Sequence, residues 1–95
     1  MTFAAVIEYS PDVAKAAELR PAHREYLKSL LKNNQLVLAG PLTDDSGALI
    51  VYEAGTEAEV EGLMRNDPFF HGGVFISWKI RPWKPVMANQ ALLPS

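Results

Sequence analysis

The stretch that decides the fold is "QLVLAGPLTDDSGALIVYEA", residues 35–54. Two apolar runs, 35–42 and 47–54, flank the turn-forming residues "TDDS" and begin again at a glycine, which is the pattern of a β-hairpin. Within both runs, apolar residues stand at consecutive positions rather than at every second one. A strand with one face in water alternates, so both faces of this hairpin are expected to be buried.

The elements around the hairpin predict the fold class. "FAAVIEY" at 3–9 and "VFISWKIRPW" at 74–83 read as strands, and helices are predicted from Asp12 to about Asn33 and after Thr56. The order βαββαβ is that of the ferredoxin-like α+β fold, a four-stranded antiparallel sheet with two helices on one face. No residues remain to cover the other face. We therefore expect a partner subunit to cover it, in a homodimer.

Local signals predict where the helices begin. Ser10 is expected to be the N-cap of the first helix, with Pro11 at its first position. Pro21 is expected to break or restart this helix. Thr56 and Glu59 form a T-x-x-E capping box for the second helix.

Composition excludes several classes of function. The 95 residues carry a net charge of −2, with 48% hydrophobic and 21% charged residues, as in an ordinary globular domain. The basic residues are spread out, so we expect no binding to nucleic acid or to an anionic membrane surface. The chain has no cysteine and hence no disulfide framework.

The two ends of the chain predict location and domain limits. The opening residues "MTFAAVIEYS" lack a basic region, and their apolar run stops at Glu8, so they are neither a signal peptide nor a membrane span. A cytoplasmic location is the expectation. Residues 1–86 are predicted to form the single domain, and residues 87–95, "MANQALLPS", a C-terminal tail.

Two residues are candidates for acid/base chemistry. His23 shares a helical face with Leu19, Leu27, Leu30 and Leu31, so its ring should point towards the sheet and need a partner there. In a βαββαβ fold the helices run antiparallel, which brings Asp67, just past the second helix, towards His23. An aspartate bonded to one imidazole nitrogen leaves the other free to move a proton. A purely structural His–Asp hydrogen bond is the alternative interpretation.

Other side chains could surround this pair. Arg20 could bind a carboxylate or phenolate, or it is a surface arginine at a helix break. Pro68 and the following glycines are expected to end the second helix and to exclude a regular helix around His71. With two histidines and no cysteine, a metal site is not expected. The candidate lining of a pocket is then Arg20, Phe69, Phe70 and His71.

Alternation along the last strand assigns its aromatic residues to two faces. Trp78 is expected on the face of Ile76 and Ile80, while Phe75 and Trp83 point the opposite way.

Six segments in order resemble the YciI-like family: "RPAHREYLKSL", "LVLAGPLTD", "GALIVYEA", "NDPF", "GGVF" and "IRPWKPV". The resemblance covers about residues 3–86. It implies a dimeric α+β barrel of ferredoxin-like subunits, an active-site His–Asp pair at His23 and Asp67, and no cofactor. It also implies an activity of the kind known in the family, dehydrochlorination of a chlorinated hydroxyhydroquinone in aromatic degradation.

Two functions remain open from the sequence. The first is a cofactor-independent lyase, dehydrochlorinase or isomerase that acts on a small aromatic or cyclic substrate. The second is a dimeric ligand-binding or interaction module in which the His23–Asp67 pair is structural.

Overall fold

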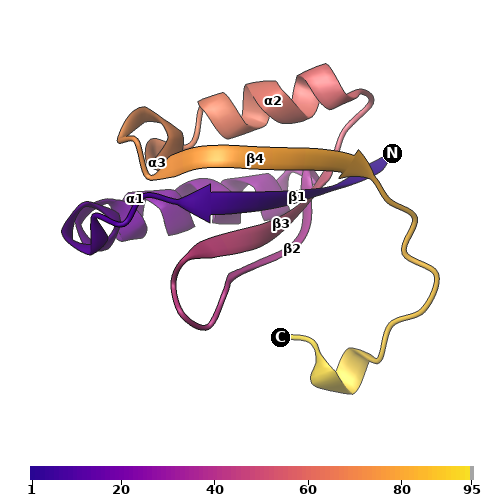
Figure 1. The fold of residues 1–95 in the computed structure, drawn as a ribbon. Coiled ribbons are helices and arrows are strands. Elements are labelled where there is room, and N and C mark those ends of the chain that lie inside the picture. The colour runs from indigo at the N-terminus through magenta and orange to yellow at the C-terminus, as the bar shows by residue number, and fades with distance from the viewer. Residues whose placement is uncertain (95) are drawn as a thin grey trace.

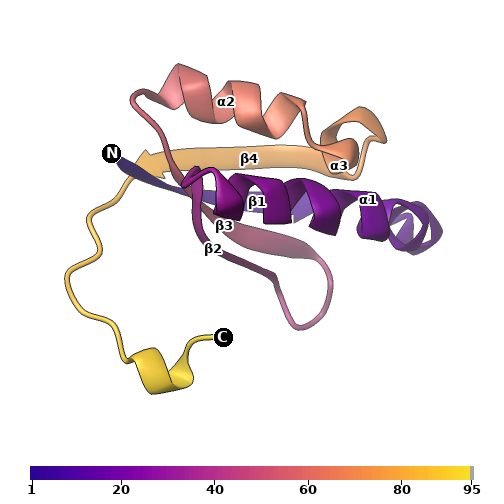
Figure 2. The ribbon, with the colours of Figure 1, turned by 180° about the vertical axis from the view of Figure 1, so that it is seen from behind.

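The computed structural model describes residues 1–94, which form a four-stranded antiparallel sheet of order β2-β3-β1-β4 with helices on one face (Figure 1). The strands are β1 (Thr2–Tyr9), β2 (Leu36–Pro41), β3 (Gly47–Glu53) and β4 (Phe75–Pro82). The helices are α1 (Val13–Lys32), α2 (Glu57–Arg65), the short α3 (Pro68–His71) and the 3₁₀ turn η1 (Gln90–Leu92). Figure 2 shows α1 and α2 from behind. The predicted ferredoxin-like arrangement is confirmed.

Helix α1 differs from its prediction at its start and at its proline. Its N-cap is Asp12 and not Ser10: the Asp12 side chain accepts a hydrogen bond from Lys15 N–H at 3.1 Å. The Ser10 hydroxyl accepts a hydrogen bond from Asp12 N–H at 3.2 Å. The helix also continues through Pro21 without a break. Proline inside a helix costs about 3 kcal/mol. Packing of buried residues on both sides of Pro21 outweighs this cost.

The buried side of α1 is narrower than the leucine pattern predicted. Ala16, His23 and Leu30 are buried, each seven residues after the last, whereas Leu31 is 50% exposed. At about 100° per residue, Leu31 lies about 80° around the helix from His23, outside the stripe formed by Ala16, His23 and Leu30. The side of α1 that meets the sheet is therefore centred on His23.

Helix α2 begins as predicted. The Thr56 side chain accepts from Glu59 N–H at 3.2 Å, and the Glu59 carboxylate accepts from Gly55 N–H at 2.8 Å. The capping box that the sequence predicts is therefore present. Val60 and Met64 are the buried residues of this helix.

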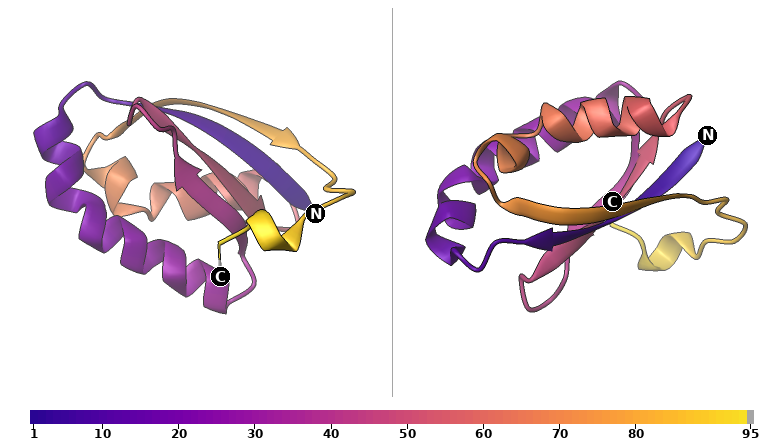
Figure 3. Two further views of the ribbon diagram at one scale, coloured as in Figure 1. Left: turned by 90° about the horizontal axis from the view of Figure 1, so that it is seen from below. Right: turned by 45° about the horizontal axis from the view of Figure 1, so that its top comes forward.

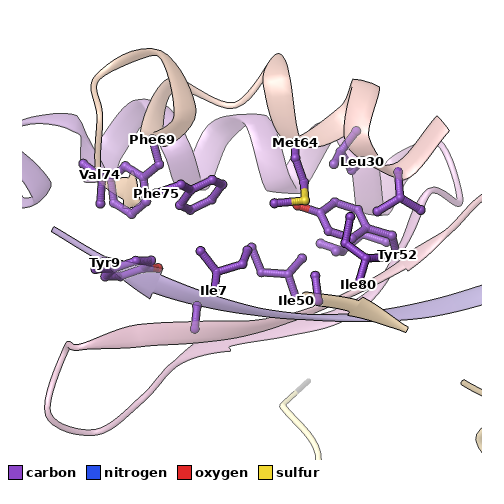
Figure 4. Packing of buried hydrophobic residues seen from close by; sticks show 14 of the residues in the cluster. Ile7, Tyr9, Leu30, Ile50, Tyr52, Met64, Phe69, Val74, Phe75 and Ile80 are labelled. Carbon is purple, nitrogen blue, oxygen red and sulfur yellow. The ribbon is translucent and has the colours of Figure 1, made fainter. Parts of the chain in front are cut away.

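A β-bulge in the pairing of β1 with β4 changes the direction of the aromatic residues there. Ile7 pairs with Trp78, but Tyr9 pairs with Phe75, because the register shifts between Glu8 and Tyr9. The bulge places Phe75 and Trp78 on the same side of the sheet, so the expectation that they point oppositely is wrong. Figure 4 shows Phe75 with Tyr9 and Phe69 at one end of the core.

The sheet face away from the helices is apolar at its centre. On it Val51 is buried, while Val6 is 57% and Leu49 is 39% exposed. Glu8 on β1 and Lys79 on β4 border this patch and are exposed. The patch fits the expectation of a covering subunit, and the homodimer stays a prediction.

Beyond β4 the chain leaves the sheet and ends in η1 (Figure 1). Residue 95 of the predicted tail lies outside the described residues, and the boundary at residue 86 stays a prediction. Across residues 1–94, none of the helices has the length and apolar character needed to cross a membrane.

Candidate active site

His23 of α1 contacts Asp67, the residue that caps α3. The two helices pack against each other, and Figure 3 shows them side by side. His23 Nδ1 lies 2.8 Å from Asp67 Oδ1 and 2.9 Å from Oδ2. His23 is 6% exposed and Asp67 is fully buried. The structure thus brings together the two residues that the sequence selected, although His23 stands in the middle of α1 rather than near the start of a restarted helix. Their catalytic role stays a prediction.

Asp67 is held in place by the helix that follows it. It is the N-cap of α3, and its Oδ1 accepts from Phe69 N–H at 2.9 Å. Pro68 occupies the first position of α3, where its missing N–H has no cost. The expectation that Pro68 and the glycines exclude a helix around His71 is therefore wrong. The same geometry that caps α3 aims the carboxylate at His23.

Aromatic rings fix the plane of the imidazole. The ring of Phe69 stacks on that of His23 with centroids 3.8 Å apart and an interplanar angle of 6°. Phe75 meets the imidazole edge-on at 6.1 Å and 88°. Tyr9 packs against both phenylalanines, at 5.5 Å from Phe69 and 6.0 Å from Phe75. The imidazole has one partner for Nδ1 and little freedom to turn.

The imidazole also lines a small cavity between α1 and the edge of the sheet formed by β2 and β3. The cavity has a volume of about 140 Å³. An apolar cavity of about 150 Å³ holds a benzene molecule, so this one has room for a single six-membered ring. Because Nδ1 is bonded to Asp67, Nε2 is the nitrogen left for a ligand. The residues that line the cavity are Tyr9, Arg20, His23, Arg24, Leu27, Ala39, Gly40, Pro41, Ala48, Ile50 and Phe69.

Tyr9 is a lining residue that the sequence analysis did not name. Burial, reinforced by the nearby Asp67 carboxylate and opposed by Arg20, raises the pKa of the Tyr9 hydroxyl to about 12. Its hydroxyl therefore stays a proton donor well above neutral pH. Alternation from Phe3 through Ala5 and Ile7 was the signal that could have found it, because it places Tyr9 on the helix side of β1.

The predicted lining residues divide into two groups. Arg20 and Phe69 line the cavity, as expected. Phe70 and His71 do not: Phe70 packs on Trp78 with ring centroids 5.4 Å apart, and His71 is exposed beside it. Within residues 1–94, no three His, Cys, Asp or Glu side chains form a group that could hold a metal ion.

These features define a class of protein: a ferredoxin-like α+β domain with a buried His–Asp pair beside a cavity of single-ring size. The chain belongs to the YCII-related domain family, whose model matches residues 1–84, and the resemblance found in the sequence is confirmed. Comparison with curated proteins gives no match.

A solved structure shares this fold. It is 5-chloro-2-hydroxyhydroquinone dehydrochlorinase (TftG) from Burkholderia phenoliruptrix AC1100, in complex with 2,5-dihydroxybenzoquinone. The two chains are 28% identical, and the match covers 88% of this chain and 94% of that chain with a TM-score of 0.78.

Proposed function

We propose that this protein is an enzyme that moves protons on a single-ring hydroxylated substrate, as a lyase of the dehydrochlorinase type or as an isomerase. One observation carries the proposal. His23 has one ring nitrogen bound to a buried carboxylate and lines a cavity of about 140 Å³, so its other nitrogen is placed for a ligand. A positioned histidine whose partner fixes its tautomer is the usual arrangement of a general base.

Each residue has a distinct part in this proposal. His23 accepts and returns a proton through Nε2, and Asp67 orients the ring and stabilises its charged form. Phe69 and Phe75 keep the imidazole in place and limit the entry of water. Arg20 binds an oxygen that carries negative charge. An acid/base step of this kind needs no cofactor.

Loss of HCl from a chlorinated trihydroxybenzene shows how the pair would act. His23 takes a proton from a ring hydroxyl and returns it to the ring carbon that bears chlorine. A second hydroxyl then gives its proton to the neutral His23, and its electrons form a carbonyl and expel chloride through the ring. Two hydroxyl protons and one chloride leave while one proton enters on carbon, so the net loss is HCl and the product is a hydroxyquinone.

The similar dehydrochlorinase supports this choice of chemistry. Its name describes loss of HCl from a hydroxylated ring, and the ligand in its structure is a single-ring quinone. A cavity of single-ring size in the present chain accords with such a substrate.

We further propose a homodimer that covers the apolar face around Val6, Leu49 and Val51. We also propose a cytoplasmic location.

The test is turnover of 5-chloro-2-hydroxyhydroquinone by the purified protein, without oxygen, followed by chloride release and by quinone absorbance. His23→Ala should lower the rate by about 10²–10⁴-fold, the usual contribution of a general acid/base. His71→Ala is the matched control, because the second histidine is exposed and away from the cavity, and it should keep the wild-type rate. His23→Asn, which keeps a donor towards Asp67, serves if the alanine variant does not fold.

The alternative function predicts a different result. A ligand-binding or interaction module would bind single-ring molecules without releasing chloride. In that case His23→Ala would lower thermal stability and would have no turnover to remove. Equal rates in wild type and His23→Ala would contradict the proposed role of the pair.

A further inference from the structure

Two arginines flank the candidate base at the cavity. Arg20 and Arg24 stand one helical turn apart on α1, and both line the same cavity as His23. Arg20 is half-buried and Arg24 is exposed, which places Arg24 nearer the solvent. The rest of the lining is largely apolar, with Leu27, Ile50 and Phe69 among it. The cavity thus combines an apolar interior with two positive charges.

Within the described residues 1–94, neither arginine forms an ion pair. Among residues 1–94, Lys28 pairs with Glu25 and Arg65 pairs with Glu61, both at 3.9 Å, but no carboxylate lies within ion-pairing distance of Arg20 or Arg24. Like charges four residues apart also disfavour a helix. The stability of α1 therefore does not explain the pair, and its charge remains available to a ligand.

We propose that Arg20 and Arg24 together form an anion site in this cavity, and that its ligand is a single six-membered ring bearing ionised oxygens, such as a phenolate or a hydroxyquinone anion. Arg24 is then a specificity-determining residue. Guanidinium groups bind such oxygens by charge-assisted hydrogen bonds, and the apolar interior accepts the ring. The inference rests on the proposed function, because it assumes that this cavity is where the substrate binds.

The charge of the ligand has a consequence for the proposed reaction. Negative charge grows on a ring oxygen when His23 removes its proton. A guanidinium beside that oxygen stabilises this charge in a cavity with few other polar groups. Tyr9, which stays protonated because its pKa is about 12, adds a neutral donor to the same cavity.

The test compares an anionic and an uncharged ring. Binding of 2,5-dihydroxybenzoquinone, an anion at neutral pH, and of hydroquinone, which is uncharged there, is measured by calorimetry on wild type, Arg20→Gln and Arg24→Gln. Each substitution should weaken binding of the quinone anion by about tenfold or more, the effect of one charge-assisted hydrogen bond, and leave hydroquinone binding unchanged. Added salt should weaken binding of the anion alone.

Arg65→Gln is the matched control, because Arg65 is an exposed arginine on α2 outside the cavity, and it should bind both rings as wild type does. Circular dichroism confirms that each variant is folded. Wild type that fails to bind the quinone anion overturns the inference, as does Arg24→Gln that binds it with wild-type affinity.

The two proposals fail separately in these experiments. Arginine-dependent binding of the anion without chloride release would keep the anion site and reject the dehydrochlorinase activity. Chloride release that depends on His23 but not on Arg20 or Arg24 would keep the enzyme and reject the anion site.

Discussion

Replacing Asp67 by asparagine separates a catalytic from a structural role of the His23 pair. In the wild type, Phe69 N–H donates a hydrogen bond to the Asp67 carboxylate at 2.9 Å. The asparagine oxygen can still accept this bond, and the asparagine amide nitrogen can face His23 Nδ1. Two charge-assisted bonds become neutral ones. A hydrogen bond to a charged group contributes about 1.5–3 kcal/mol and a neutral one about 0.5–1.5 kcal/mol, a difference of about 1–1.5 kcal/mol for each bond, so the free energy of unfolding should fall by about 2–3 kcal/mol.

The effect on activity should be far larger than the effect on stability. An asparagine amide donates to Nδ1, which forces the histidine proton onto Nε2, the nitrogen that has to accept a proton from the substrate. Turnover should then fall by about 10²–10⁴-fold. Asp67→Ala is the comparison: it leaves His23 and Phe69 N–H buried without a partner and should cost about 3–5 kcal/mol.

Both quantities can be measured on the same samples. Chloride release from 5-chloro-2-hydroxyhydroquinone gives turnover, and thermal unfolding followed by circular dichroism gives stability, with about 4–8 °C of Tm per kcal/mol for a domain of this size. The reasoning is refuted if Asp67→Asn keeps turnover within about tenfold of wild type while losing as much stability as Asp67→Ala. That result would make the pair a structural link between α1 and α3.

Three further predictions concern stability and assembly. The pKa of Tyr9 is raised to about 12, so its stabilising contribution should be complete below about pH 10 and be lost as the pH rises to about 12; urea unfolding of wild type and Tyr9→Phe at pH 9 and 11 should show a shallower decline in the variant. A Cβ on Gly47 would overlap the backbone carbonyl of Ile7, so Gly47→Ala should lower the free energy of unfolding by about 1–3 kcal/mol. Gly62→Ala, which points into open space on α2, should instead raise it by about 0.5–1 kcal/mol, and equal effects would contradict this explanation. Sedimentation should show a dimer at micromolar concentration, and Val6→Glu on the exposed apolar face should dissociate it; a monomeric wild type would refute the expected assembly.

The features that the sequence predicts well are those with a local or topological signal. Consecutive apolar residues identify the hairpin, and the βαββαβ order fixes how the helices run. His23 could be placed because its helical face and the antiparallel helices both bring it towards Asp67. These arguments need only periodicity and connectivity, and the contact between residues 23 and 67 follows from them.

The features that the sequence missed depend on tertiary packing. Nothing in the local sequence shows that burial of α1 outweighs the cost of Pro21, or that a bulge beside Tyr9 turns Phe75 towards the helices. Three consecutive residues, Phe69, Phe70 and His71, also look alike as candidates for the cavity. Only the turn of α3, about 100° per residue, directs Phe69 to the cavity and the next two side chains away from it.

The double use of the Asp67 carboxylate ties the site to local unfolding. Helix α3 has four residues, too few to be stable alone, and its cap is the same oxygen that contacts His23. An opening that unfolds α3 and withdraws the Asp67 carboxylate exposes the Phe69 amide and frees the imidazole together. Hydrogen exchange at this single amide therefore reports the fraction of molecules in which the site is assembled, and a ligand that slows exchange there is one that binds the assembled state.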